Sequence, residues 1–207
     1  MKGFIVTGTD TGIGKTVFAA GLTAALRGTY WKPVQSGLEE ETDTEVVARL
    51  CAGTGAQVLP EAYRLKTPCS PHEAARIDGI TMDCDRLKLP AAEDPLIVEG
   101  AGGVLVPYTD DLLAADLFSC WALPAIIVAR TALGTISHTL LTVEALKARG
   151  VLIAGVVFTG EEEPVAQRAI AHFSGVAQLG RLPQLEPLDA AGLSAAFATN
   201  IRLDLMA

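Results

Sequence analysis

The residues whose spacing first suggests chemistry are Gly8-Thr9-Asp10-Thr11-Gly12-Ile13-Gly14-Lys15-Thr16, a glycine-rich segment that ends in a Lys-Thr pair. The apolar run Phe4-Ile5-Val6 precedes this segment, and a helical pattern over 17–26 follows it. Glycines let backbone N–H groups approach phosphate oxygens, and the first turn of the helix adds unpaired donors. In such a loop Lys15 reaches the β- and γ-phosphates, and the Thr16 hydroxyl ligates magnesium. The segment therefore predicts a nucleotide-binding P-loop.

The spacing within this loop differs from the standard pattern. Five residues lie between Gly8 and Gly14, whereas the usual P-loop has four at this place. A glycine-rich turn that only joins a strand to a helix is the alternative interpretation. Such a turn has no need of the Lys15-Thr16 pair at the start of the helix, so we expect an atypical P-loop.

A second signal lies in 95–103, where the apolar strand Pro95-Leu96-Ile97-Val98 ends in Glu99 and a glycine-rich turn. A carboxylate at that place suits a magnesium ligand in a P-loop protein. Lys32 is expected at the carboxyl end of a strand over 30–34, because a lysine inside a covered parallel sheet would be costly to bury without an anion. Asp43 could join this site, or it could simply belong to the first turn of a helix capped by Thr42.

The apolar strands alternate with helical segments, which predicts an α/β fold with a doubly wound, mostly parallel sheet, helices on both faces and the P-loop NTPase arrangement. Because its length favours one unit, residues 1–207 are expected to form a single P-loop domain. In such folds the ligand edge lies where the strands end. We therefore expect Lys15, Lys32, Asp43, Glu99 and the 131–138 loop to share one site. Further strands are expected over 124–129, 151–158 and 177–182, with helices over 112–121, up to about 149, 165–173 and 189–197.

Composition limits the classes of partner. Sixteen basic and 24 acidic residues give a net charge of −8, which argues against binding nucleic acid or an anionic membrane as the main activity. No apolar run approaches the roughly 18 to 20 residues that span a bilayer, and no secretory signal opens the chain, so a cytoplasmic protein is expected. The four cysteines form no C-x-x-C pair, which indicates neither a zinc site nor a redox dithiol.

Taken together, the motifs resemble those of the dethiobiotin synthetases. The resemblance covers residues 3 to about 183 in the order of that family, and five motifs besides the P-loop make it specific. These motifs are Lys32-Pro33-Val34-Gln35-Ser36-Gly37, Thr42-Asp43, Ser70-Pro71-His72, Val98-Glu99-Gly100-Ala101-Gly102-Gly103 and Leu133-Gly134-Thr135-Ile136-Ser137-His138-Thr139.

The resemblance implies an ATP- and Mg²⁺-dependent enzyme of biotin synthesis. In this family 7,8-diaminononanoate takes up CO₂ as a carbamate, and the γ-phosphate of ATP is transferred to it. The neighbouring amine then expels phosphate and closes a cyclic urea, leaving ADP. Because the carbamate and the transferring phosphoryl group are both anionic, the chemistry depends on lysines and magnesium to hold them together.

The resemblance also implies roles for particular residues. Thr16, Asp43 and Glu99 match magnesium ligands, and the catalytic set is Lys15, Lys32, Thr11 and Ser36. The nucleotide-binding set is Asp10, Thr11, Gly12, Ile13, Gly14, Lys15, Thr16, Val17, Glu99, Gly100, Gly102, Thr159 and Pro183. The substrate-binding set is Thr11, Lys32, Ser36, Gly134, Thr135, Ile136 and Ser137, of which the last four hold the substrate carboxylate across a dimer interface in the family. A homodimer with two composite sites is therefore implied.

Two positions depart from the family pattern. Thr159 stands where the family often has an asparagine that reads adenine, which predicts weaker discrimination between nucleotide bases, so that other nucleoside triphosphates could serve. Ser137 stands where asparagine is common.

Two other activities fit part of this pattern. A nucleotide-dependent switch or partition ATPase of the same superfamily would usually carry a second lysine early in the P-loop, and 9–12 has none. A synthetase of the amidotransferase type would generally need an ammonia source, and this chain has no room for a glutaminase domain. Hydrolysis without any diamine would distinguish the switch from the synthetase.

Overall fold

The computed structural model describes residues 2–205 and contains a seven-stranded sheet in the order β11-β10-β9-β1-β6-β2-β4. Every pairing in this sheet is parallel, which confirms the predicted doubly wound α/β class. Its strands are β1 (Gly3–Gly8), β2 (Thr29–Trp31), β4 (Gln57–Val58), β6 (Leu96–Gly103), β9 (Ala125–Arg130), β10 (Ile153–Thr159) and β11 (Gln178–Leu182).

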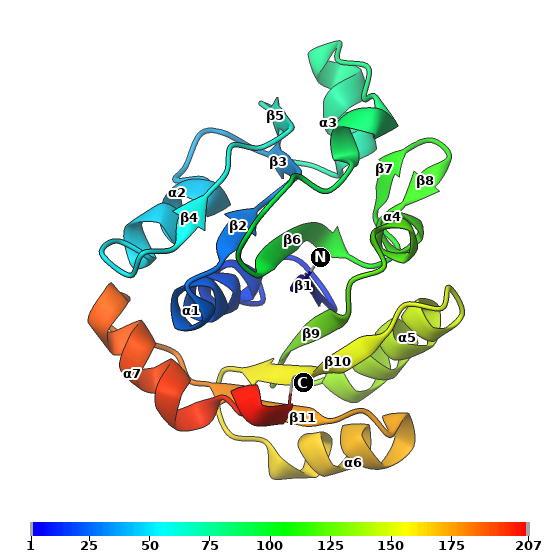
Figure 1. Ribbon diagram of the computed structural model, residues 1–207. Helices are drawn as coiled ribbons and strands as arrows, with labels where there is room; N and C mark the ends of the chain where they lie inside the picture. Colours follow the sequence, from blue (N-terminus) through cyan, green and yellow to red (C-terminus); the bar gives the residue numbers. More distant parts are fainter. Residues whose placement is uncertain (1, 206–207) are drawn as a thin grey trace.

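Helices cover both faces of the sheet (Figure 1). One face carries α1 (Lys15–Leu26), α2 (Asp43–Leu50) and α7 (Ala190–Asn200), and the other carries α4 (Ala114–Trp121), α5 (Thr135–Lys147) and α6 (Pro164–Ser174). The remaining elements are α3 (Pro71–Asp78), the 3₁₀ turns η1 (Cys84–Leu87) and η2 (Leu203–Leu205), and the two-stranded sheets β3 (Val34–Ser36) with β5 (Tyr63–Leu65) and β7 (Pro107–Thr109) with β8 (Leu112–Leu113).

The hydrophobic core forms two layers, one on each side of the sheet. Successive residues of β1 point to opposite faces, so Ile5 packs in the layer under α4, α5 and α6 while Val6 packs in the layer under α1, α2 and α7. In the second layer the rings of Phe18 and Phe197 lie 5.4 Å apart between centroids, which ties the C-terminal helix to the helix of the P-loop. Burial of strands on both faces explains why their sequences are apolar throughout.

The predicted strand over 30–34 is two strands instead of one. β2 ends at Trp31, and β3 begins at Val34 in a separate sheet. Pro33 has no N–H to donate to a ladder, and its carbonyl accepts from Tyr63 N of β5 at 3.0 Å, so the chain changes sheets at this residue. Lys32 therefore follows the end of β2, as predicted.

Several boundaries also differ from the sequence predictions. β6 continues through the glycines to Gly103 instead of ending at Glu99. The segment expected to be helical from Leu112 begins with β8, and α4 starts at Ala114. Ser70 precedes α3 and makes no side-chain cap hydrogen bond. The two- and three-residue strands β4, β5 and β7 were too short to give a periodic signal.

Gly180 joins β11 to the C-terminal segment at a place where a side chain cannot fit. Its φ is 125°, it pairs with Ile201, and Arg202 N donates to Leu179 O at 2.7 Å. A Cβ there would lie far inside van der Waals contact distance of the Asn200 carbonyl oxygen. We expect Gly180→Ala to lower the free energy of unfolding by about 3 kcal/mol, measured by urea titration, because backbone strain and a rigid backbone clash add together.

Gly175→Ala is the matched control for this substitution. Gly175 also has a positive φ, of 65°, but nothing lies within 4 Å of the place where its Cβ would be. We expect this variant to lose only about 1 to 2 kcal/mol from the left-handed backbone. Equal losses in the two variants would show that the contact with Asn200 adds no cost.

Among residues 2–205 no helix has both the length and the apolar character needed to cross a membrane. Cys51 is buried and the other three cysteines are exposed, and all four are free thiols. The thiols therefore form no disulfide framework.

Candidate active site

The phosphate-binding loop is held by contacts within itself. Lys15 Nζ donates to the Asp10 carbonyl oxygen at 2.6 Å, and Thr11 N donates to Asp10 Oδ1 at 2.8 Å. Gly14 precedes α1 with φ of 92°, a left-handed conformation that glycine adopts without steric cost. No side chain caps the N-terminus of α1, and no acidic residue lies in its first turn. The backbone donors at this helix start can therefore meet an anion.

Four side chains from four parts of the chain meet beside this loop. Thr16 Oγ1 lies 2.9 Å from Asp43 Oδ1 and 3.0 Å from Glu99 Oε1. Lys32 Nζ forms an ion pair with Asp43 Oδ2 and a second one with Glu99 Oε1 at 3.3 Å. The structure thus brings Thr16, Lys32, Asp43 and Glu99 into one cluster, as the sequence predicts for the ends of parallel strands.

Asp43 is placed by the start of α2. Thr42 and Glu45 form a reciprocal capping box, in which Glu45 N donates to Thr42 Oγ1 and Thr42 N donates to Glu45 Oε2. Gln35 Oε1 also accepts from Asp43 N at 3.3 Å. Asp43 therefore serves the helix start and faces the cluster at once, so the two interpretations of this residue do not exclude each other.

Burial and neighbouring charge set the protonation of the cluster. Burial raises the pKa of Glu99, against the opposing effect of Lys32. Burial also acts upward on Asp43, but Lys32 and the hydrogen bonds from Lys32 and Thr16 hold the pKa of Asp43 below its usual value. For Lys32 burial acts downward, yet Glu99 and Asp43 raise the pKa above that of an ordinary lysine. Burial lowers the pKa of Lys15.

The oxygens of this cluster fit a hard divalent cation. One hydroxyl and two carboxylates converge from Thr16, Asp43 and Glu99, and all are oxygen donors. Mg²⁺ is usually held by one or two carboxylates together with waters and substrate phosphates. A nucleotide bound by the neighbouring loop would supply those phosphates. The donor set is therefore compatible with Mg²⁺.

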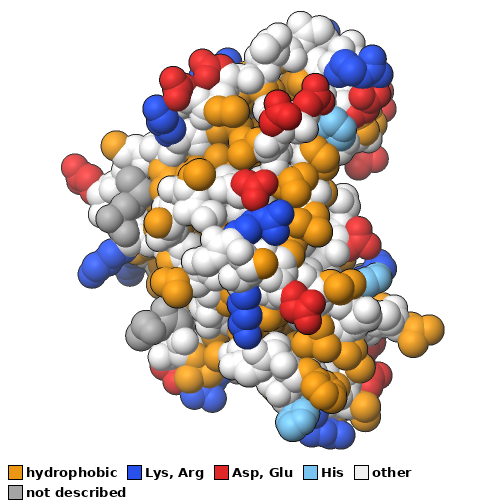
Figure 2. Space-filling model, turned by 90° about the vertical axis from the view of Figure 1, so that its right-hand side faces the viewer, with side chains coloured by type: hydrophobic (Ala, Val, Ile, Leu, Met, Phe, Trp, Pro, Cys, Tyr) orange, Lys and Arg blue, Asp and Glu red, His pale blue; other side chains and the backbone are white. Residues whose placement is uncertain are grey.

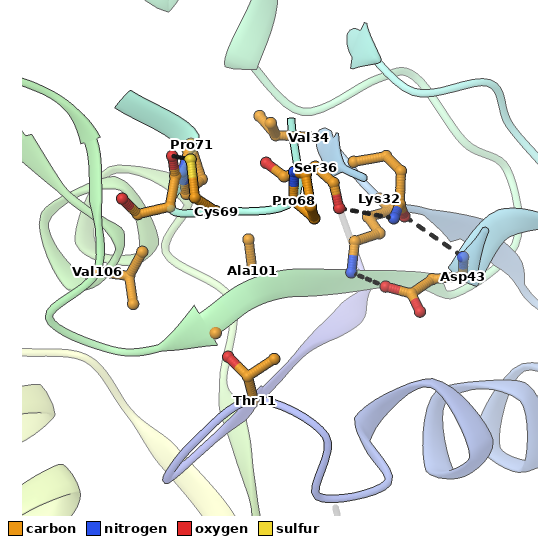
Figure 3. A pocket seen from close by; sticks show the side chains of 13 residues that line it. Thr11, Lys32, Val34, Ser36, Asp43, Pro68, Cys69, Pro71, Ala101 and Val106 are labelled. Atoms are coloured by element: carbon orange, nitrogen blue, oxygen red, sulfur yellow. Dashed lines mark hydrogen bonds and ion pairs between the residues drawn. The ribbon is translucent and has the colours of Figure 1, made fainter. Parts of the chain in front are cut away.

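A cavity of about 380 Å³ opens beside Lys32 (Figure 3). Thr11 rises from the P-loop on one side of it, and Cys69 and Pro71 lie on the opposite side. Three of the four residues predicted to be catalytic, Thr11, Lys32 and Ser36, line this cavity. The full lining is Thr11, Lys32, Val34, Gln35, Ser36, Asp43, Pro68, Cys69, Ser70, Pro71, Ala101, Gly102 and Val106.

A second cavity, of about 390 Å³, lies on the other side of the P-loop. The Thr159 hydroxyl donates to Ile13 O at 2.7 Å, so it binds the loop and is not free to meet a ligand as a donor. Arg130 and Gln184 are the long polar side chains that line this cavity. The lining is Gly12, Ile13, Gly14, Val17, Arg130, Thr159, Gly160, Leu182, Pro183, Gln184, Leu185 and Leu188, which includes six of the predicted nucleotide-binding residues.

Gly134 and the first turn of α5, Thr135 to Ser137, do not join Lys32 within one chain. This segment follows β9, which lies on the far side of β1 from β6 and β2, and it borders a separate cavity with Val165. The expectation of one shared site is therefore not met by a single chain. His138 of α5 lines a groove together with Thr11 and Leu141. This groove reaches the P-loop from the side of α5.

Large apolar side chains are exposed in this groove and at the cavity that Val165 borders. Leu133 is fully exposed, and Leu105 and Leu141 are each more than half exposed. Figure 2 shows hydrophobic side chains on this face of the molecule, interspersed with charged groups. An exposed apolar surface next to a groove is typical of a protein interface.

Sequence reasoning missed some residues of these sites. Arg130 ends β9 and pairs with Asp10 at 3.5 Å, and a basic residue at a strand end was a usable signal. Gln35 is a second residue of this kind, because it lines the cavity beside Lys32 and accepts from Asp43 N. Gly100 lines neither the cavity beside Lys32 nor the cavity on the other side of the P-loop, and a Cβ there would lie 2.8 Å from Phe118, so this glycine also permits close packing against α4.

The parallel sheet with helices on both faces and the glycine-rich loop at α1 define a P-loop α/β protein. Two solved structures share the fold at 11% identity and a TM-score of 0.54. A chain of the MinC:MinD cell division protein complex of Aquifex aeolicus matches with 95% of this chain and 86% of that chain. A ParA family ATPase of Chlorobium tepidum matches with 96% and 93%. The AAA domain family model matches residues 2–192.

Relatives of much higher identity define the family more narrowly. The ATP-dependent dethiobiotin synthetase BioD of Agrobacterium fabrum is 57% identical over 200 residues, which are 97% of this chain and 94% of that protein. The protein of the same name from Rhodopseudomonas palustris is 54% identical over 203 residues, 98% of this chain and 95% of the relative. This chain therefore belongs to the dethiobiotin synthetase family.

Proposed function

We propose that this protein is an ATP-dependent dethiobiotin synthetase that closes the ureido ring of dethiobiotin. The substrates are 7,8-diaminononanoate, CO₂ and ATP, and the products are dethiobiotin, ADP and phosphate. The observation that carries this proposal is the placement of Lys32 at the border between the cation cluster and the cavity lined by Thr11 and Ser36. Identity of 57% to a dethiobiotin synthetase over nearly the whole chain supports the assignment.

The reaction follows three steps. One amine of the substrate adds to CO₂ and loses a proton, which gives a carbamate. A carbamate oxygen attacks the γ-phosphorus of ATP, and ADP leaves, which gives a carbamic-phosphoric anhydride. The second amine then attacks the carbonyl carbon and loses a proton, and phosphate leaves with the closing of the five-membered ring.

The cations of this site serve the anionic steps. Lys15 neutralises the phosphates from the P-loop side, and Lys32 Nζ turns from Asp43 and Glu99 to the carbamate and the transferring phosphoryl group. When Mg²⁺ is bound it supplies charge neutralisation of the β- and γ-phosphates. Thr16, Asp43 and Glu99 would hold that ion, and Lys32 would then be released from part of its pairing with the two carboxylates.

The diamine end of the substrate occupies the cavity beside Lys32, where Thr11 and Ser36 contact the amines. The distant carboxylate is held by backbone donors of Gly134 to Ser137 from a second copy of the chain. The separation of that loop from Lys32 within one chain and the exposed Leu133 and Leu141 support a homodimer with composite sites.

Phosphate release with ATP, Mg²⁺ and bicarbonate, measured with and without 7,8-diaminononanoate, tests the proposed reaction. We expect release to depend on the diamine, and mass spectrometry to show dethiobiotin in equal amount. Release that ignores the diamine and yields no cyclic product would replace the synthetase proposal with that of a nucleotide-dependent switch.

Discrimination between nucleotide bases is expected to be weak. The Thr159 hydroxyl is already used by Ile13 O, and the second cavity is otherwise mostly apolar, so only Arg130 and Gln184 bring long polar side chains to a base. We expect GTP and CTP to support dethiobiotin formation within about tenfold of the rate with ATP, because apolar contacts discriminate little.

Gln184→Ala is the companion variant in this comparison of nucleotides. It removes one of the two long polar side chains, so the differences between ATP, GTP and CTP should narrow further. Rates with CTP or GTP about a hundredfold below the rate with ATP would contradict weak discrimination and would indicate that backbone groups read the base.

A further inference from the structure

The buried hydroxyl of Tyr30 has a partner that its packing does not explain. Tyr30 lies on β2 with no exposed surface, and its ring packs in the core layer with Val6 and Phe18. Its hydroxyl donates to Glu99 Oε2 at 2.8 Å. Phenylalanine would fill the same space, and a buried hydroxyl must be hydrogen-bonded to avoid a cost. What the hydroxyl adds to the ring is therefore its hydrogen bond to the Glu99 carboxylate.

The two oxygens of Glu99 have different partners. Oε1 faces Thr16 Oγ1 at 3.0 Å and Lys32 Nζ at 3.3 Å, whereas Oε2 meets Tyr30. The last torsion of a glutamate is broad, so a carboxylate held at one oxygen alone can rotate. The Tyr30 hydroxyl removes this freedom from a side chain that is 1% exposed.

We propose that Tyr30 is a positioning residue for the divalent-cation site. Its hydroxyl fixes Glu99 Oε2, so that Oε1 is presented beside Thr16 Oγ1 and Asp43 Oδ1 as a ligand. This inference rests on the proposed function, since it takes Glu99 as a ligand of Mg²⁺. Partners that orient metal ligands commonly change metal affinity or activity by about 10- to 100-fold when they are removed.

Tyr30 itself does not contact the substrates. It lines neither the cavity beside Lys32 nor the cavity on the other side of the P-loop. Its effect must therefore act through Glu99, whose other oxygen contacts Thr16 and Lys32. A role confined to packing would change stability but not cation affinity.

Mn²⁺ binding to the full-length protein with ADP, followed by electron paramagnetic resonance, tests the proposal without turnover. We expect Tyr30→Phe to weaken Mn²⁺ binding by about 10-fold and to raise the Mg²⁺ concentration for half-maximal rate by a similar factor. At saturating Mg²⁺ its kcat should approach that of the wild type, because no group that touches the substrate has changed.

Tyr108→Phe is the matched control. Tyr108 is also completely buried, but its hydroxyl accepts from Ala101 N at 3.0 Å and contacts no carboxylate. This variant should lower the melting temperature and leave Mn²⁺ affinity unchanged. An equal loss of affinity in both variants would show a general loosening of the site and would overturn the proposal.

Glu99→Ala separates this inference from the function on which it rests. We expect Glu99→Ala to weaken Mn²⁺ binding, and Tyr30→Phe to add no further loss in the double variant, because Tyr30 acts through that carboxylate. Unchanged affinity in Tyr30→Phe, or an additive loss in the double variant, overturns the positioning role. The proposed reaction fails separately, if the wild-type protein forms no dethiobiotin.

Discussion

Replacing Lys32 by alanine is expected to lower kcat for dethiobiotin formation by about 100- to 1,000-fold, with little change in nucleotide affinity. Lys32 is 5% exposed and lies between two carboxylates and the cavity beside them. The negative charge that it meets on the carbamate exists only when the diamine and CO₂ are bound. Its loss should therefore raise the barrier of the reaction and leave the binding of ATP by the P-loop nearly intact. Steady-state rates and the dissociation constant of an ATP analogue measure the two effects.

Lys88→Ala controls for the removal of a lysine as such. Lys88 pairs with Asp85 on the surface, and both side chains are more than three-quarters exposed. This variant should keep the rate and the nucleotide affinity of the wild type. If Lys32→Ala weakens nucleotide binding as much as it lowers kcat, then Lys32 only binds phosphate.

Lys32→Ala should also lower the free energy of unfolding, because Lys32 balances the charge of two carboxylates. Without Lys32, Asp43 and Glu99 face each other across the Thr16 hydroxyl with no cation between them. Removing one partner from a buried ion pair costs about 3 kcal/mol or more, so the free energy of unfolding without Mg²⁺ should fall by that amount. Added Mg²⁺ should restore part of it, since a ligand that binds only the folded state stabilises that state.

The sequence predicted the parts of the site that follow strands. Lys15 and Thr16 come after β1, Lys32 after β2, and Glu99 lies within β6, which pairs with both strands. Apolar strands and their polar ends are local patterns, and parallel pairing brings such ends to one edge of a sheet. The cluster could therefore be predicted before its geometry was known.

No local sequence pattern indicates which side chains contact each other inside the two core layers. Tyr30 is one aromatic residue in a strand where aromatics are common, and nothing local indicates that its hydroxyl meets Glu99 69 positions away. A proline at position 33 suggests that a strand ends there. That the chain then enters a second sheet depends on β5, a strand of only three residues. Contacts of this kind depend on packing between distant segments, which periodicity does not record.

Two inactive variants of this chain are expected to restore activity to each other when they share a dimer. Ser137→Asp places a carboxylate in the first turn of α5, where it suits the helix N-terminus but repels the substrate carboxylate. Ser137 is exposed, so the substitution should leave the fold intact. Alone, this variant should lose about 100-fold in kcat/KM for the diamine, since a fixed anion is opposed by another, and Lys32→Ala should lose about 100- to 1,000-fold in kcat for the reason given above.

In a mixed dimer of these variants, one composite site combines the intact Lys32 of one subunit with the intact Ser137 of the other. Random pairing makes half of the dimers mixed with one working site of two, so coexpression should yield about a quarter of the wild-type activity. If each chain instead built its site alone, every site in the mixed dimer would carry one of the two defects and activity would stay absent. The Thr135–Lys147 helix would then act within its own subunit, and the substrate carboxylate would have to be bound by other groups near Thr11, such as those of the groove that contains His138.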